Sequence, residues 1–339
     1  MKAFISRTLS GIDSLVLEEV PSPGPLGPGQ VRIALRAASV NYRDLLVLSG
    51  ALASVTLPEL IPCSDGAGEV VEVAPDVGRV RVGDHVALTF NPDWIGGPWE
   101  PSRGGAGRGG GIQGVMRQEI VVHQQETVLI PAHLSFAEGA TLPCAAVTAW
   151  HALCAGRALL PGMTVLLQGG GGVSLFALQF AKLFGARVIH VSSSAERCAR
   201  LKSLGADETL DYRANPKWSA AVRELTGGGV DLAVDVGGAD TIEQSLAATR
   251  MFGRVALVGR LTGRASVIPM GSSYAEMYPV AVGSRQDFEA MNRAIAFHEV
   301  RPVIDSRFEF AQLPAALRRL ESGRHMGKIV IEFDSRAGR

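Results

Sequence analysis

Short apolar runs, separated by glycine and proline, dominate the first third of the chain. They cover residues 31–37, 68–73, 85–90 and 119–122. Runs of this length, bounded by turn residues, are typical of antiparallel strands. The pattern therefore predicts a β-rich lobe that extends to about residue 130.

The pattern changes after residue 160, where continuous apolar segments alternate with amphipathic ones. A strand that is apolar at every position is buried on both faces, as in a parallel sheet covered by crossover helices. We therefore expect a parallel sheet with helices on its faces. The expected strands are 165–167, 188–191, 230–236 and 255–258, and the expected helices include 175–184 and 195–204.

After residue 270 the alternation weakens. A strand at 279–282, a helix at 287–298 and a last strand at 328–333 close the chain. We expect this tail to rejoin the β-rich lobe. The prediction is an α/β protein in which residues 131–274 form a parallel-sheet domain inserted between residues 1–130 and 275–339 of the other domain.

The composition argues against a nucleic-acid partner and a membrane span, and favours a reducing compartment. The 339 residues include 33 basic and 33 acidic side chains, and 47% are hydrophobic. Such a chain is apolar enough to fold, and its balanced charge provides no basic field for a nucleic acid. Four scattered cysteines without a CxxC pair fit the reducing cytoplasm. The most apolar stretch, 139–156, is interrupted by Pro143 and His151 and is shorter than the ~20 residues of a membrane span.

A glycine-rich turn joins the first predicted parallel strand to its helix. The segment reads Gly169-Gly170-Gly171-Gly172-Val173-Ser174, which is GxGxxG with serine in the last place. The first glycine permits the tight turn, the second lets the backbone approach a pyrophosphate, and the helix N-terminus supplies N–H donors. Because strand, turn, helix and following strand are all in place, we expect Gly169, Gly171, Gly172, Val173 and Ser174 to bind a dinucleotide.

The end of the second parallel strand bears on which dinucleotide binds. An acidic residue there would bind the ribose hydroxyls of NAD, but the segment reads Ser192-Ser193-Ser194 and continues to Arg197. Hydroxyl donors and a cation suit a 2′-phosphate, so NADP(H) is favoured. Two alternatives remain: the serines cap the following helix, or Glu196 faces the adenosine and repels the phosphate.

Several motifs together resemble the medium-chain dehydrogenase/reductase superfamily. They are the turn at 168–182, the LGAD segment at 204–207, Asp211-Tyr212, the strand end at 235–238 and the HMGK segment at 325–328. Asn41-Tyr42-Arg43-Asp44 most resembles the zinc-independent quinone oxidoreductase branch. The resemblance implies a Rossmann doubly wound parallel sheet inserted into a GroES-like catalytic domain, a small-molecule substrate, and a homodimer formed through the edge of the Rossmann sheet.

The resemblance also implies roles for individual residues. Ser193, Ser194, Arg197 and Tyr212 match positions that hold the 2′-phosphate in NADP-dependent relatives. The remaining cofactor positions, most of them along the nicotinamide half, are Thr148, Gly237, Val258, Gly259 and Lys328.

Zinc-dependent relatives carry three catalytic ligands whose places are occupied here by Asn41, Ser64-Asp65 and Cys144. Only one soft ligand survives, whereas catalytic zinc needs about three protein ligands. We therefore expect no zinc. The alternative is an alcohol dehydrogenase with a residual metal at Cys144 and Asp65.

Without a Lewis acid to stabilise an alkoxide, a quinone or an activated alkene or carbonyl compound is the more suitable hydride acceptor. The candidate catalytic residues are Asn41, Tyr42, Arg43, Asp44 and Asp65. Asn41 would orient the substrate or the nicotinamide, Arg43 would stabilise an enolate or quinol oxygen, and Tyr42 would donate a proton. The competing interpretation is that Asn41 and Asp44 brace the local helix. A third function class is an NADP-binding sensor or structural protein without turnover.

Residues 96–114 form a glycine-rich segment that also carries Trp99, Arg103 and Arg108. Such a segment predicts a mobile loop. It is either a surface excursion or a lid over the cleft between the two lobes.

Overall fold

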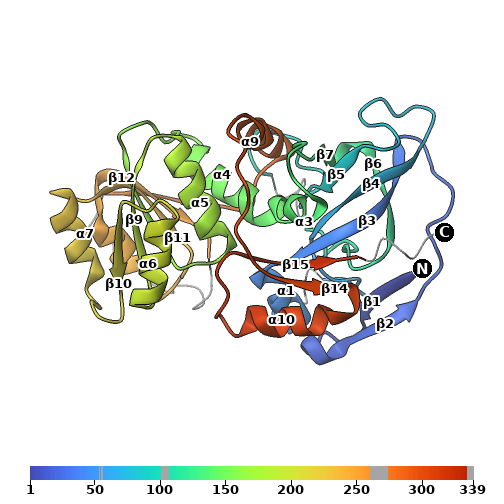
Figure 1. Ribbon diagram of the computed structural model, residues 1–339, viewed down its shortest axis with the longest axis horizontal. Coiled ribbons are helices and arrows are strands. Elements are labelled where there is room, and N and C mark those ends of the chain that lie inside the picture. Colours follow the sequence, from blue (N-terminus) through green and yellow to red (C-terminus); the bar gives the residue numbers. More distant parts are fainter. Residues whose placement is uncertain (53, 55, 101–106, 260–273, 334–339) are drawn as a thin grey trace. The chain divides into compact units, whose positions relative to one another are not determined.

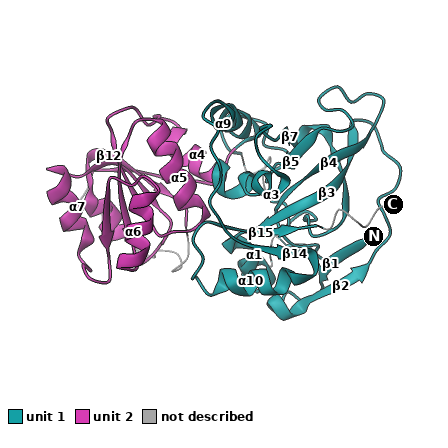
Figure 2. Cartoon of the chain, in the orientation of Figure 1, with its two compact units in different colours: residues 1–147, 284–339 teal, residues 148–283 magenta. Residues whose placement is uncertain are grey.

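The computed structural model describes residues 1–52, 54, 56–100, 107–259 and 274–333, and the chain divides into two compact units (Figure 2). Unit 1 consists of residues 1–147 and 284–339, and unit 2 of residues 148–283. Unit 2 is thus inserted between two segments of unit 1, as predicted. Both boundaries lie further along the chain than 130/131 and 274/275.

The shifted boundaries have a physical reason in hydrogen bonding. The Ser39 hydroxyl donates to the carbonyl of Ala140 at 2.9 Å, and the Cys144 amide donates to Asp65 at 3.2 Å, so the segment after residue 131 is fixed to unit 1. At the second boundary, residues 276–279 pair with the parallel sheet and therefore belong to unit 2.

In the described residues, unit 1 is built on a sheet of seven strands in the order β14-β15-β3-β4-β5-β7, with β6 paired to β3 (Figure 1). Most pairs are antiparallel, and β14 runs parallel to β15. The predicted β-rich lobe is confirmed. The strands are β3 (Gln30–Val40), β4 (Asp65–Val73), β5 (His85–Leu88), β6 (Glu119–His123), β7 (Thr127–Leu129), β14 (Ile304–Glu309) and β15 (Lys328–Glu332), with a separate pair β1 (Lys2–Ser6) and β2 (Leu15–Glu19).

Alternation explains the core of unit 1. Every second residue of β3 is buried up to Ala37, and beyond it both faces are covered. Helix α10 (Leu313–Glu321) buries Leu313, Ala316, Leu317 and Leu320, a spacing of three and four that places one apolar stripe on the core. The other helices of the unit are η1 (Ile12–Ser14), α1 (Tyr42–Leu48), η3 (Gln124–Glu126), α3 (Phe136–Gly139), η4 (Leu142–Ala146), α9 (Arg285–Phe297) and η5 (Phe310–Gln312).

Unit 2 contains a parallel sheet in the order β10-β9-β8-β11-β12-β13, with helices beside it (Figure 1). The strand order reverses between β8 and β11, which is the switch point where doubly wound folds bind ligands. The predicted fold is confirmed. The elements are α4 (Val147–Cys154), β8 (Thr164–Gln168), α5 (Gly172–Leu183), β9 (Arg187–Ser192), α6 (Ala195–Ser203), β10 (Glu208–Asp211), α7 (Trp218–Thr226), β11 (Val230–Asp235), α8 (Ile242–Ala248), β12 (Thr249–Leu257) and β13 (Glu276–Pro279).

None of the helices in the described residues combines the length and apolar character that a bilayer crossing requires.

Candidate functional site

The glycine turn of unit 2 leads from β8 into α5. Gly169 adopts φ +79°, a conformation that favours glycine, and Gly171 precedes the first turn of α5. A Cβ built on Gly171 would meet nothing within 4 Å, so open space lies directly above this backbone. The turn and the amide groups of a twelve-residue helix therefore provide an open cradle that fits a pyrophosphate.

Two buried side chains stabilise the turn through hydrogen bonds to its backbone carbonyls. The Ser174 hydroxyl donates to the carbonyl of Gln168 at 2.5 Å, so the serine that replaces the third glycine ties helix α5 to strand β8. Nε2 of His190 lies 2.7 Å from the carbonyl oxygen of Gly169. Burial lowers the pKa of His190 to about 4, so the ring is neutral at neutral pH and donates through Nε2–H. His190 was not among the residues predicted from the sequence, because it lies inside an apolar strand.

A second buried network of hydrogen bonds surrounds Asp235 at the switch point of the sheet. Its carboxylate accepts hydrogen bonds from Gln168 at 3.2 Å, from Ser245 at 2.5 Å and from Thr241 at 2.9 Å, and from the amide of Gly238 at 2.9 Å. These bonds join the ends of β8 and β11 to helix α8. The predicted residues Gly237, Val258 and Gly259 lie at the ends of β11 and β12, where the amides of Val258 and Gly259 both donate to the Asp235 carbonyl. Thr148 is buried in α4.

The predicted phosphate residues gather at the ends of β9 and β10. Ser194 caps helix α6, because its hydroxyl oxygen accepts the amide hydrogen of Arg197 at 3.2 Å. The serine hydroxyl still carries a hydrogen that can be donated, so capping and phosphate binding are compatible. The Tyr212 amide donates to the carbonyl of Ser192 at 2.9 Å, and its ring is exposed. The strand pairing thus brings Ser193, Ser194, Arg197 and Tyr212 to one edge of the sheet.

Unit 1 contains a buried polar cluster formed by Asn41, Asp65 and Lys328, with Ser39, Ser64 and Cys144 around it. The Lys328 ammonium donates to Asn41 Oδ1 at 2.6 Å and to the carbonyl of Val40 at 3.0 Å, and lies 3.7 Å from Asp65 Oδ2. Asp65 is completely buried and accepts the Ser64 hydroxyl at 2.7 Å. Lys328, which the resemblance counts with the cofactor residues, therefore lies in unit 1 beside two of the candidate catalytic residues.

Asp44 and Arg43 both form hydrogen bonds with backbone groups of unit 1. Asp44 Oδ2 accepts the amide hydrogen of Asn41 at 2.8 Å, which supports the bracing role at the start of α1. The Arg43 guanidinium donates to the carbonyl of Arg108 at 2.8 Å and stacks over Phe90 at 4.7 Å. It thereby holds the end of the glycine-rich segment. Tyr42, on the other side of the same turn, is exposed.

The glycine-rich segment is described only in part. Residues 101–106, including Arg103, lie outside the described residues. Trp94 is buried, packs edge-to-face on Trp99 at 4.8 Å and donates to the carbonyl of Gly97 at 3.0 Å. Arg108 is buried against Glu126. The two ends of the segment are therefore anchored to unit 1.

The donor set of the polar cluster does not fit a catalytic zinc. Burial and the charge of Asp65 raise the pKa of the Cys144 thiol to about 12, whereas zinc binds the thiolate. The Lys328 ammonium already contacts the oxygens of Asp65 and Asn41 that a metal ion would need. Across the described ranges, no three His, Cys, Asp or Glu side chains converge as metal ligands.

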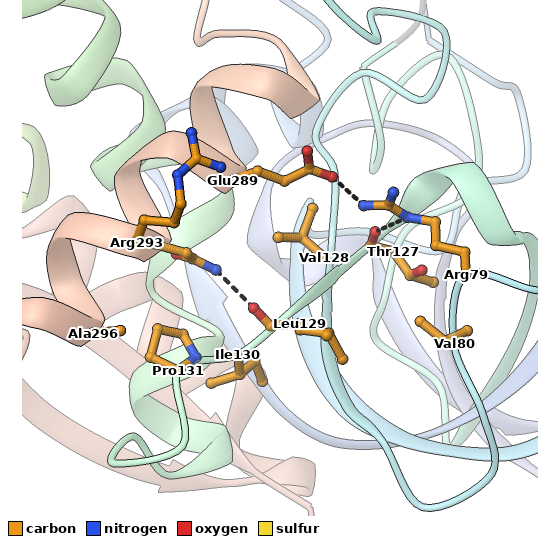
Figure 3. A pocket seen from close by; sticks show the side chains of 11 residues that line it. Arg79, Val80, Thr127, Val128, Leu129, Ile130, Pro131, Glu289, Arg293 and Ala296 are labelled. Atoms are coloured by element: carbon orange, nitrogen blue, oxygen red, sulfur yellow. Dashed lines mark hydrogen bonds and ion pairs between the residues drawn. The ribbon is translucent and has the colours of Figure 1, made fainter.

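A separate pocket of about 400 Å³ lies in unit 1 between α9 and residues 127–131, which contain β7 (Figure 3). Arg79 pairs with Glu289 across it, and the Asn292 amide donates to the carbonyl of Leu129 at 2.8 Å. These groups are bonded within the pocket wall and brace α9 against β7. The pocket shares no residue with the polar cluster or the glycine turn.

Asp44 gives unit 1 a pH-dependent stability. Burial raises the pKa of Asp44 to about 6, outweighing the nearby Arg43. The native state therefore binds this proton more tightly than the unfolded state, and stability falls as pH rises from about 4 to about 6. Relative to Asp44→Asn, the free energy of unfolding of the wild type is expected to fall by about 3 kcal/mol across this window. Above pH 7 the difference between the two proteins should stay constant.

Urea unfolding of both proteins between pH 4 and 8 measures this difference. The matched control is Asp13→Asn, whose carboxylate is 87% exposed and should give no such divergence. Parallel profiles for wild type and Asp44→Asn throughout the range would contradict the assignment.

Known proteins resemble this chain over both units. Residues 27–132 match the family model described as the alcohol dehydrogenase GroES-like domain, and residues 172–296 match the model described as zinc-binding dehydrogenase. A zinc-type alcohol dehydrogenase-like protein of Schizosaccharomyces pombe is 36% identical over 344 residues, covering 98% of this chain and 99% of that protein.

Solved structures show the same similarity. A quinone oxidoreductase of Pseudomonas syringae superposes with a TM-score of 0.82 at 25% identity, covering 98% of this chain and 99% of that one. An NAD-dependent alcohol dehydrogenase gives 0.88 at 32% identity, with coverages of 98% and 99%. The mycobacterial protein Rv1454c, solved with NADPH, gives 0.81 at 26% identity, with coverages of 98% and 100%.

Proposed function

This chain belongs to the medium-chain dehydrogenase/reductase superfamily of oxidoreductases, and from that premise we propose that it transfers hydride, without zinc, between NADP(H) and a quinone or an activated alkene or carbonyl compound. The observation that carries the proposal is the polar cluster. Where zinc-dependent relatives hold a metal, this chain buries a lysine ammonium between Asn41 and Asp65.

The choice of acceptor follows from this cluster. Hydride transfer to a simple ketone builds an alkoxide, which a Lewis acid stabilises by several kcal/mol. A conjugated acceptor spreads the developing charge onto an oxygen that a hydrogen-bond donor is able to stabilise. The Asn41 amide is such a donor, and the exposed phenol of Tyr42 is the candidate proton source.

Bound NADPH would supply the hydride, and the residues of unit 2 bind and orient it. The glycine turn receives the pyrophosphate. Ser193, Ser194, Arg197 and Tyr212 receive the 2′-phosphate, and they are gathered at one edge of the sheet without an acidic residue at the tip of β9. Thr148, Gly237, Val258 and Gly259 line the nicotinamide half.

Two observations keep an alternative open. The relative of S. pombe is named a zinc-type alcohol dehydrogenase-like protein, and Cys144 lies beside Asp65 through the 3.2 Å amide contact. A metal-assisted alcohol dehydrogenase is therefore the second candidate function. A cofactor-binding protein without turnover is the third, and the same experiment separates all three.

That experiment measures NADPH and NADH oxidation with 1,4-benzoquinone, 9,10-phenanthrenequinone and a simple ketone, on protein whose zinc content is determined beforehand. Quinone-dependent NADPH oxidation by zinc-free protein supports the proposal. Ketone reduction that follows the zinc content would favour the alcohol dehydrogenase. Tight NADPH binding without oxidation by any acceptor would favour the sensor.

Replacing Arg197 tests the phosphate site. Arg197→Gln removes a cation that a 2′-phosphate uses and NADH does not, so the Kd for NADPH should rise about 10- to 100-fold while the Kd for NADH stays unchanged. The matched control is Arg200→Gln on the same helix. Equal weakening of NADPH and NADH by Arg197→Gln would count against the 2′-phosphate assignment.

The implied homodimer would form along the free edge of the parallel sheet, where β13 is the outermost described strand. Sedimentation equilibrium tests this association.

A further inference from the structure

We infer that Lys328 is a positioning residue of the proposed reaction, which holds the Asn41 amide so that its N–H group faces the substrate oxygen. The inference rests on the proposed function and names the part of the site that orients the substrate. It gives Lys328 a role different from the cofactor contact that the resemblance implies.

The Lys328 ammonium is surrounded by acceptors of unit 1. An ammonium group has three N–H donors and no acceptor. Lys328 Nζ has three acceptors around it: the carbonyl of Val40 at 3.0 Å, Asn41 Oδ1 at 2.6 Å and Asp65 Oδ2 at 3.7 Å. The Lys328 side chain is 3% exposed. Two of its donors therefore make hydrogen bonds inside unit 1, Asp65 faces it as an ion pair beyond hydrogen-bond distance, and burial leaves the ammonium almost no exposed surface for a phosphate of the cofactor.

The contact with Lys328 determines the orientation of the Asn41 amide. Only the oxygen of an amide is able to accept from an ammonium, so Lys328 fixes which end of the Asn41 amide is oxygen and which is nitrogen. The nitrogen donates one hydrogen to the Ser64 hydroxyl, at the long distance of 3.4 Å. Within the described chain, its second N–H has no acceptor. This N–H is the group offered to the substrate.

Asp65 supplies the counter-charge of Lys328. Asp65 is fully buried, and its carboxylate balances the Lys328 ammonium. The pair is neutral as a whole, which makes a buried lysine tolerable. Asp65 also accepts hydrogen bonds from the Cys144 amide in η4 and from the Ser64 hydroxyl just before β4. These bonds fix the carboxylate that faces the ammonium.

The test uses the full-length protein and separates orientation from charge balance. Lys328→Met alone leaves Asp65 uncompensated and is expected to fold poorly. The informative variant is Lys328→Met with Asp65→Asn, which removes both charges and keeps the shape of residue 65. Lys2→Met, an exposed lysine of the same unit, is the matched control.

With the best quinone acceptor, the double variant should keep its NADPH Kd within about twofold while kcat falls about 10²-fold, as for the loss of one oriented donor. Asn41→Ala should give a similar loss, and adding it to the double variant should cost nothing more, because both changes remove one N–H contact. Wild-type kcat in the double variant would overturn the inference. An increased NADPH Kd with unchanged kcat would also overturn it and make Lys328 a cofactor ligand.

A second readout does not depend on activity. The chain has four asparagines, so selective ¹⁵N-asparagine labelling gives four side-chain amide pairs, and Asn41→Ala identifies the one of Asn41. The double variant should shift and broaden that pair, whereas Lys2→Met should not. An unshifted pair would overturn the inference. A shifted pair in a protein whose wild type reduces no acceptor would refute the proposed function and support the orientation by Lys328.

Discussion

Replacing Asp65 by alanine is expected to lower the free energy of unfolding by about 3–5 kcal/mol, because it leaves the buried ammonium of Lys328 without a counter-ion. The same substitution removes the acceptor of the Cys144 amide and of the Ser64 hydroxyl. Ser64 is completely buried and Cys144 is partly buried, so the loss of these two hydrogen bonds adds to the cost. Urea unfolding, followed by circular dichroism and by tryptophan fluorescence, measures the change from the shift of the midpoint at constant slope.

The control for this prediction removes the stranded charge. Asp65→Ala combined with Lys328→Met should recover part of the lost stability, since the two effects are coupled and not additive. A loss below about 1 kcal/mol for Asp65→Ala alone, within the range of ordinary surface substitutions, would show that the pair does not stabilise the fold.

Gly259→Ala is expected to be the most disruptive single-methyl change in unit 2. A Cβ at this position would lie 1.6 Å from the carbonyl oxygen of Val236, and a backbone atom cannot move aside as a flexible side chain does. The amide of Gly259 also bonds the Asp235 carbonyl at 3.1 Å, so the ends of β11 and β12 would have to separate. We expect a loss of about 3 kcal/mol or more, at the upper end of overpacking, together with weakened NADPH binding.

Gly171→Ala is the matched glycine substitution. Its Cβ would meet nothing within 4 Å, so the melting temperature should stay unchanged. The added methyl would nevertheless stand where the pyrophosphate approaches the backbone, so NADPH binding should weaken. Equal melting temperatures for Gly259→Ala and wild type, or unimpaired NADPH binding by Gly171→Ala, would contradict this account of the two glycines.

The parts of the fold that depend on local patterns could be predicted from the sequence. The turn at Gly169 was identifiable because the apolar strand, the glycines and the amphipathic helix follow one another directly. Strand β14 was missed because its apolar residues are sparse, and helix α10 was missed although its apolar residues at 313, 316, 317 and 320 have helical spacing.

The candidate site was predicted less completely, for a related reason. Lys328 and Asn41 are separated by 287 positions, and their contact exists only because β15 pairs with β3. Arg43 was predicted to stabilise a substrate oxygen, and this role stays a prediction; its hydrogen bonds to the carbonyls of Arg108 and Gly109, 65 and 66 positions away, could not be read from the sequence. The sequence shows that an arginine is present, but only the fold shows which acceptors its guanidinium contacts.

The place of β15 in the sheet of unit 1 has a consequence for synthesis of the protein on the ribosome. This strand lies between β14 and β3, and it carries Lys328, yet it is the last strand of the unit to be made. Until it emerges, β3 lacks its β15 neighbour along Ala37–Val40, on the side opposite β4, and Asp65 lacks its counter-ion. Unit 2, continuous in sequence, has all of its strands available earlier. We therefore expect nascent chains to acquire the parallel-sheet unit first and to depend on chaperones at the open edge of β3 until translation ends.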